Sequence, residues 1–289
     1  MRPSSVAPVI VGVDGSASSL SAVRAAADQA SLYGCPLRIV HAFNWLACQP
    51  EALDTYPGTT ANQLIEQAEA VARERSPHLT IATRLLEGAP TSTLLRQAHT
   101  AALLAIGDGG LSAHICLPTH ASAVHVAARA CCSVLIARVT PPYDGPLLVG
   151  VNGSSASERA LDFAFDAAAR RGTDLIVVRA GTSGTGAGGN DTDHVRDLAD
   201  LVAPREDKYR VTARIRVLDG DPGAVLVAES ERAGLVIVGA RGEQPYGGLL
   251  GSAAQALLHH SCAPLILVRG PMPRRPEQAD RALAAAVTI

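Results

Sequence analysis

Short apolar runs recur along the whole chain and alternate with longer stretches in which apolar and polar residues mix. Runs of about four to eight apolar residues between turn residues are typical of strands buried in a parallel sheet. We expect such strands at Val9–Val13, Leu37–Ala42, Leu79–Leu86, Leu103–Gly107, Val134–Arg138, Leu147–Gly150, Leu175–Val178, Val211–Val217, Leu235–Val238 and Leu265–Val268. The pattern therefore predicts five short strands in each half of the chain.

The stretches between these runs carry the spacing of amphipathic helices. Apolar residues fall at helical intervals within Ala17–Tyr33, and a helix is also expected over Thr91–Thr100 and within Asn44–Arg75. The segment Ser155–Glu158 has the form of a capping box, which predicts a helix start there. Strands that alternate with helices predict an α/β fold with a doubly wound, five-stranded parallel sheet in each half.

The two halves are copies of one another. Val9–Ser16 and Leu147–Ser154 match nearly residue for residue at an offset of 138 (147 − 9), and a period this long indicates two domains rather than a solenoid. The prolines and glycine of Pro141–Pro146 suit a short linker between them. We expect a first domain over residues 6–140, a second over 146–270, and a C-terminal tail over 271–289.

Composition narrows the function classes. The chain has 289 residues, of which 47% are hydrophobic and 18% charged, so each domain can bury a sizeable core. A net charge of -2 and an aromatic content of 3% argue against nucleic acid as a partner. We expect no membrane span, because no apolar run reaches about 18 residues, and no secretory signal, so the expected location is the cytoplasm.

Cysteine and histidine patterns indicate no metal site. None of the six cysteines forms a Cys-x-x-Cys pair, and we expect them to be reduced. A redox role for the adjacent Cys131 and Cys132 stays open. His114, His120 and His125 are spaced six and five residues apart, which does not match a compact helical ligand pair. Lys208 is the only lysine, so the Walker-type phosphate loop is excluded.

A glycine-rich loop follows the strand Leu235–Val238. In this loop two residues separate Gly239 from Gly242. Eight residues then separate Gly242 from the adjacent Gly251 and Ser252, which stand at the start of an expected helix. Glycines let backbone N–H groups approach a phosphate, and a helix N-terminus adds partial positive charge. This segment therefore predicts a phosphate-binding corner.

These motifs together resemble a tandem universal stress protein of the actinobacterial type. The resemblance rests on the Val-Gly-Val-Asp-Gly-Ser opening, the acid-Gly-x-Pro turn after the third strand, and the glycine-rich loop before the last helix, and it covers about Val9 to Arg269. It implies a five-stranded α/β layer with strand order 3-2-1-4-5. One branch of that family binds ATP through Gly-x2-Gly-x9-Gly-[Ser/Thr], so the resemblance implies ATP as ligand, with Mg²⁺ as a candidate companion ion.

The resemblance implies that the second half holds the main nucleotide site. Gly239, Gly242, Gly251 and Ser252 match the family pattern, although the spacer has eight residues instead of nine. Asn152 stands where the family has an acid near the ribose. An amide can bond hydroxyls without the strength of a charged acceptor, and the Asn152 segment also suits a turn and helix N-cap.

The first half has the family spacing but different chemistry. Asp14, Gly107 and Gly110 are in place, whereas His120 and Ala121 stand where the pattern requires Gly-Ser. We expect a weaker, altered or empty site there. A protonated His120 that contacts phosphate is the open alternative.

Two functions remain. One is an ATP-binding regulatory protein of the stress response, with at most slow ATP hydrolysis and no catalytic residues; the alternative is a nucleotide-free interaction or scaffold module of the same fold. A phosphoacceptor receiver domain is disfavoured, because Arg138 and Arg269 stand where it needs a lysine. The family's strand order leaves the last strand of each half at an edge, and edge strands seek partners, so we expect these strands to pair as an intrachain pseudo-dimer. The resemblance to tandem members of the family also implies a homodimer.

Overall fold

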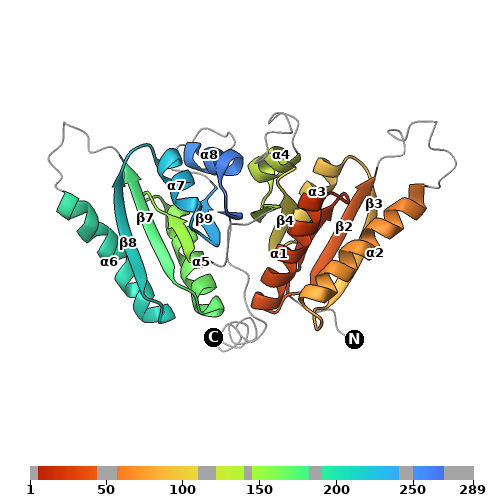
Figure 1. Cartoon of the computed structure of the whole chain (residues 1–289), viewed down its shortest axis with the longest axis horizontal. Helices are drawn as coiled ribbons and strands as arrows, with labels where there is room; N and C mark the ends of the chain where they lie inside the picture. The colour runs from red at the N-terminus through yellow and green to blue at the C-terminus, as the bar shows by residue number, and fades with distance from the viewer. Residues whose placement is uncertain are drawn as a thin grey trace, which may run out of the picture. The chain divides into compact units, whose positions relative to one another are not determined.

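The computed structural model describes residues 6–43, 57–109, 122–139, 145–181, 191–240 and 250–269. Its strands are β1 (Val9–Val13), β2 (Leu37–Phe43), β3 (Ile81–Glu87), β4 (Leu103–Gly107), β5 (Ser133–Ala137), β6 (Leu147–Gly150), β7 (Leu175–Gly181), β8 (Ala213–Asp219), β9 (Leu235–Gly239) and β10 (Leu265–Val268). The chain divides into two compact units, the first with β1–β5 and the second with β6–β10 (Figure 1).

Each unit contains a parallel sheet with the predicted order. The first unit has the order β3-β2-β1-β4-β5, and the second unit has the equivalent order β8-β7-β6-β9-β10. The predicted doubly wound α/β fold is therefore confirmed. In this order the chain leaves β1 for β2 on one side and returns to β4 on the other, and β6 is placed in the same way, so each sheet has a switch point beside its first strand.

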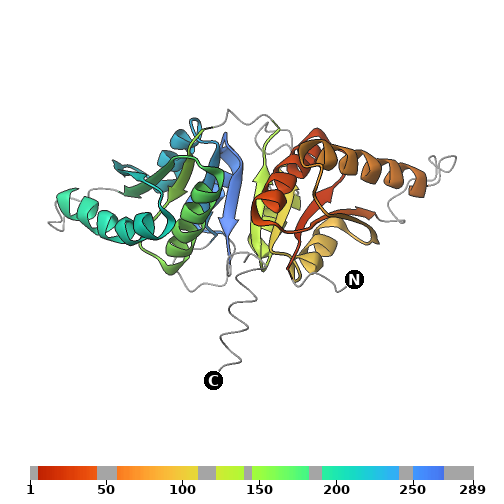
Figure 2. The ribbon, with the colours of Figure 1, turned by 90° about the horizontal axis from the view of Figure 1, so that it is seen from below.

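The helices pack on both faces of each sheet. They are α1 (Ala17–Tyr33), α2 (Pro57–Arg75), α3 (Pro90–Ala98), α4 (Ser122–Arg129), α5 (Ser155–Arg171), α6 (Asp191–Tyr209), α7 (Pro222–Ser230) and α8 (Ser252–His260). Helix α1 packs against α2, α5 against α6, and α7 against α8 (Figures 1 and 2). The second unit also includes α4, where Arg269 Nη2 donates to the carbonyl oxygens of Ala127 and Ala128 at 2.7 and 3.0 Å.

Strands β3 and β8, at the outer edges of the two sheets, begin two residues later than predicted. The apolar pattern placed their starts at Leu79 and Val211, but β3 starts at Ile81 and β8 at Ala213. The N–H of Leu79 donates to the carbonyl of Ser76 at 3.1 Å, so Leu79 belongs to the turn that ends α2. Apolar residues thus extend beyond the sheet into the preceding turn.

The central strands form the cores of both units. Most of their side chains are buried, as expected for strands covered on both faces. Gly12 in β1 leaves room for α3, because a Cβ there would lie 2.8 Å from Leu94 Cδ1 of α3 and that side chain would have to shift. Gly150 in β6 meets Leu226 Cδ1 of α7 in the same way, at 2.7 Å. The first glycine of the predicted opening motif therefore lets a helix approach the first strand of each unit.

Candidate functional site

The predicted site residues of the second unit gather at the carboxyl edge of its sheet. Strand β6 ends at Gly150, shortly before Asn152, and the adjacent parallel strand β9 ends at Gly239. Loops that follow two neighbouring parallel strands meet at the same edge. This is the switch point of the sheet, where doubly wound folds bind their ligands.

Gly239 lies against the first turn of α5. A Cβ at this position would stand 2.8 Å from both the backbone carbon and the backbone oxygen of Ala156. Real Cβ atoms essentially never come this close, and a backbone cannot move aside as a flexible side chain can. The loop after β9 therefore starts against the first turn of α5, the helix that follows the Asn152 loop.

Helix α8 opens beside that loop without a capping side chain. Its N-cap is Gly251, with φ -64° and ψ 157°, and the N–H of Gly251 donates to the carbonyl of Ala240 at 3.2 Å. In the described part of the chain no side chain caps this end, and the first helical residue, Ser252, is exposed. The first-turn N–H groups of a helix have no partner within the helix, so this end can accept an anion.

Asn152 presents an amide donor rather than an acceptor. Its Oδ1 accepts hydrogen bonds from the N–H and the Oγ of Ser154, at 3.1 and 2.7 Å. The Oγ of Ser154 accepts from the N–H of Ser157 at 3.2 Å and caps α5. Because Oδ1 accepts these two bonds within the protein, the Nδ2 group of the exposed Asn152 is the part of this side chain that can donate to a ligand.

The cap of α5 corrects one prediction. The turn and N-cap expected at Asn152–Ser154 are confirmed, whereas the capping box was placed one residue too late, since the N-cap is Ser154 and not Ser155. A cap at Ser155 would need the N–H of Glu158, but that N–H donates to the carbonyl of Ser154 at 3.0 Å, while the Oγ of Ser154 takes the N–H of Ser157. Asp221 also caps a helix, since its carboxylate accepts from the N–H of Ala224 at 3.0 Å at the start of α7.

Asp14 occupies the equivalent place in the first unit. Its Oδ1 accepts from the N–H and the Oγ of Ser16, at 2.9 and 2.6 Å. Partial burial alone would raise the pKa of Asp14, but hydrogen bonds from Ser16, with a further contribution from Ser19, outweigh it and lower the pKa. Asp14 is therefore held as a carboxylate at neutral pH. Gly107 lies against α1 as Gly239 lies against α5, since a Cβ there would stand 2.6 Å from the backbone carbon of Ser18.

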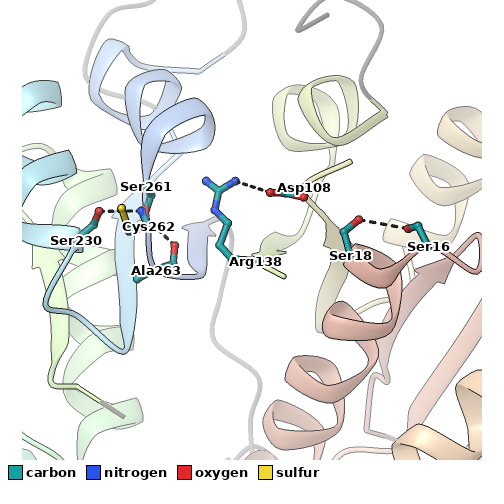
Figure 3. A network of polar contacts seen from close by, with 8 residues as sticks. All are labelled: Ser16, Ser18, Asp108, Arg138, Ser230, Ser261, Cys262 and Ala263. Carbon is teal, nitrogen blue, oxygen red and sulfur yellow. Dashed lines mark hydrogen bonds and ion pairs between the residues drawn. The ribbon is translucent and has the colours of Figure 1, made fainter. Parts of the chain in front are cut away.

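A buried ion pair in the first unit was missed by the sequence reasoning. Asp108 follows Gly107 directly, and its Oδ2 lies 3.4 Å from Nη1 of Arg138 (Figure 3). Both side chains are buried, with exposed fractions of 0% for Asp108 and 2% for Arg138. The pair follows from the strand register, because Gly107 pairs with Ala137 and the residues after them are neighbours, and the sequence alone does not give this register. The corresponding residue in the second unit is Ala240, so only the first loop carries this acid.

Four of the residues considered for the sites lie outside the described residues. These are Gly110, His120, Ala121 and Gly242. The structure therefore brings together Asn152, Gly239, Gly251 and Ser252 in the second unit, and Asp14 with Gly107 in the first. Within the described ranges, no helix combines the length and apolar character needed to cross a bilayer.

Comparison with known proteins identifies the class. The family model described as the universal stress protein family matches residues 6–138 and again 145–269. Universal stress protein Rv2623 of Mycobacterium tuberculosis is 32% identical over 284 residues, covering 90% of this chain and 96% of that protein. Rv2005c of the same organism is 30% identical over 284 residues with the same coverage.

A solved structure shows the same fold. The crystal structure of a universal stress protein from Archaeoglobus fulgidus superposes with a TM-score of 0.68 at 15% identity, covering 91% of this chain and 96% of that chain. The chain belongs to the universal stress protein family, with two copies of the family domain. The resemblance stated from the sequence is thereby confirmed.

Proposed function

We propose that this protein is an adenine-nucleotide-binding regulator of the stress response, acting in the cytoplasm rather than as an enzyme. ATP is the proposed ligand, with Mg²⁺ as a candidate companion, and the main site is the second-domain loop with Gly239, Gly242, Gly251 and Ser252. The observation that carries the proposal is the uncapped N-terminus of α8. It opens at the switch point of the sheet, next to a strand end that only glycine fits.

Asn152 completes this site by contacting the sugar. Its Nδ2 group can donate to a ribose oxygen or to a phosphate, whereas its Oδ1 is held by Ser154. Asp14 offers the opposite chemistry in the first domain, because a carboxylate only accepts hydrogen bonds. At this position the second-domain site would donate a hydrogen bond to the nucleotide, whereas the first-domain site would accept one.

The first domain binds nucleotide more weakly in this proposal. Asp14, Gly107 and Gly110 would supply its contacts, but Asp108 adds a carboxylate directly behind Gly107. The nearby guanidinium of Arg138 neutralises that charge and is thereby unavailable to attract a phosphate. Together with His120 and Ala121, this pair supports an asymmetric protein with one strong site.

The test measures nucleotide in the intact chain. Mass spectrometry of ligand released from the purified protein, followed by calorimetric titration of the stripped protein with ATP, should show one strong site per chain. Gly251→Asp places a carboxylate at the proposed phosphate and should weaken binding about tenfold or more, a free-energy change of about 1.4 kcal/mol or more. His120→Asp alters the corresponding position of the first domain and should leave this strong binding unchanged.

Other results would overturn the proposal. A protein that carries no nucleotide and takes up no ATP is the nucleotide-free interaction module instead. An ATP affinity unchanged by Gly251→Asp would show that the nucleotide does not bind at the second-domain loop. Equal losses from Gly251→Asp and His120→Asp would contradict the asymmetry between the domains. Sedimentation of the same samples tests the proposed homodimer.

A further inference from the structure

A thiol and an imidazole meet at the amino edge of the first sheet. The opposite, carboxyl edge of the same sheet carries Asp14 and Gly107. Cys131 lies in the turn between α4 and β5, at the amino end of β5. Its Sγ is 3.5 Å from Nδ1 of His99, the C-cap residue of α3. Both residues are exposed, whereas the adjacent Cys132 is buried.

This geometry favours the reactive form of the cysteine. The nucleophile in thiol chemistry is the thiolate, and a neighbouring imidazole promotes it by accepting the thiol proton. With the ring proton on Nε2, Nδ1 of His99 can accept that proton directly across the 3.5 Å contact. Exposure then gives a small reagent access to the sulfur.

The second unit contains the same turn with different chemistry. Val134 of β5 pairs with Leu104 and Leu265 of β10 pairs with Val236, which makes Cys262 the counterpart of Cys131. Cys262 is also free and exposed. Its N–H donates to Ser230 Oγ at 3.1 Å (Figure 3).

The C-cap residues distinguish the two thiols. His99 and Glu231 occupy the same place, since the backbone N–H of each donates to the carbonyls two and three residues earlier in α3 or α7. An imidazole nitrogen can take the thiol proton, whereas a glutamate side chain has no basic nitrogen. The chain thus carries two exposed cysteines at equivalent positions, and the Sγ of Cys131 contacts the imidazole at the C-cap of its neighbouring helix.

We propose that Cys131 and His99 form a site of reversible thiol modification by low-molecular-weight disulfides. The Cys131 thiolate attacks one sulfur of the reagent, a new S–S bond forms to Cys131, and the reagent's own S–S bond breaks. The departing half leaves as a thiolate, and the proton from Cys131 resides on His99 until solvent or the leaving thiolate takes it. Attack by a free thiol reverses the reaction.

The test compares the two cysteines within one molecule. The full-length protein is treated with glutathione disulfide at neutral pH, quenched by alkylation, and mapped by mass spectrometry as a function of time. Cys131 should be modified about fivefold or more faster than Cys262, because His99 can accept its proton during the attack. His99→Glu should bring Cys131 down to the rate of Cys262, and Glu231→His should raise the rate of Cys262.

Further variants separate proton acceptance from simple contact. His99→Gln keeps a hydrogen-bonding side chain without a basic nitrogen, so it should lose the rate advantage as His99→Glu does. Unfolding in urea should make the modification rates of Cys131 and Cys262 converge, because the contact between Cys131 and His99 depends on the fold. Equal rates for Cys131 and Cys262 in the native protein, or an unchanged Cys131 rate in both His99 variants, would overturn the proposal.

Discussion

Gly239→Ala tests the backbone contact on which the proposed site is built. The added methyl group would stand 2.8 Å from the backbone carbon and oxygen of Ala156 in the first turn of α5. Relief requires α5 or β9 to shift, because no flexible side chain stands in between. Helix and strand are both anchored in the core, where Ala160 and Ile237 are fully buried.

The size of the effect follows from two opposing terms. Overpacking that displaces backbone costs about 1–3 kcal/mol, and a helix–strand contact falls at the upper end of that range. Replacing Gly by Ala also restricts the unfolded chain, which contributes about 0.4–1 kcal/mol of stability in the other direction. The net loss should be about 2 kcal/mol, which lowers the midpoint of thermal unfolding by about 4–8 °C for a unit of this size.

Differential scanning calorimetry of Gly239→Ala beside Gly181→Ala measures this loss. Gly181 ends β7, and a Cβ there would meet nothing within 4 Å, so this control variant should be neutral or slightly more stable than the wild type. The opposite signs distinguish steric contact from a general effect of alanine. If both variants unfold at the wild-type temperature, the close approach of β9 to α5 is wrong, and the argument that only glycine fits there fails.

Three further predictions concern charge and capping. Asp108→Ala removes the carboxylate beside the buried Arg138 and should lower the free energy of unfolding by about 3 kcal/mol in calorimetry. The double variant Asp108→Ala/Arg138→Met should recover part of this loss, and a loss below about 0.5 kcal/mol for Asp108→Ala would contradict a coupled pair. Ser154→Ala removes the cap of α5 and should cost about 1 kcal/mol in urea titrations, whereas replacement of the exposed Ser155 by alanine should cost nothing measurable. Equal losses for the two variants would contradict Ser154 as the N-cap. Asp14 has a lowered pKa in the folded state, so its charge stabilises the fold above the ordinary aspartate pKa and ceases to do so as the pH falls through the lowered value. Asp14→Asn should therefore cost about 0.5 kcal/mol at pH 6 and progressively less toward pH 3, and a pH-independent difference would exclude the charge as its cause.

Most of the fold could be predicted because burial imposes a simple pattern. Ala17–Tyr33 was predicted with the bounds that α1 has, since Ser16 caps one end and Gly34 ends the other with a φ of 63°. The central strands are buried on both faces and read as continuous apolar runs. The edge strands are half exposed, so their apolar residues do not mark where pairing begins.

The chemistry of the site was less accessible to sequence reasoning. Glycines and a helix start follow a recognisable order, so Gly239 and Gly251 could be placed at one edge from the sequence alone. The pair of Asp108 and Arg138 lies 30 residues apart in sequence and depends on the exact register of β4 and β5. The contact of Cys131 with His99 spans 32 residues and joins two turns, whose conformation leaves no periodic signal.

The open N-terminus of α8 has a thermodynamic consequence. A ligand that binds only the folded state adds RT ln(1 + [L]/Kd) to its stability, about 2.7 kcal/mol when the ligand stands at a hundred times its Kd. Under the proposed function, this helix end links the survival of the second unit to the supply of nucleotide. A cell with abundant ATP would then hold a longer-lived protein than a starved one, with no change in its synthesis.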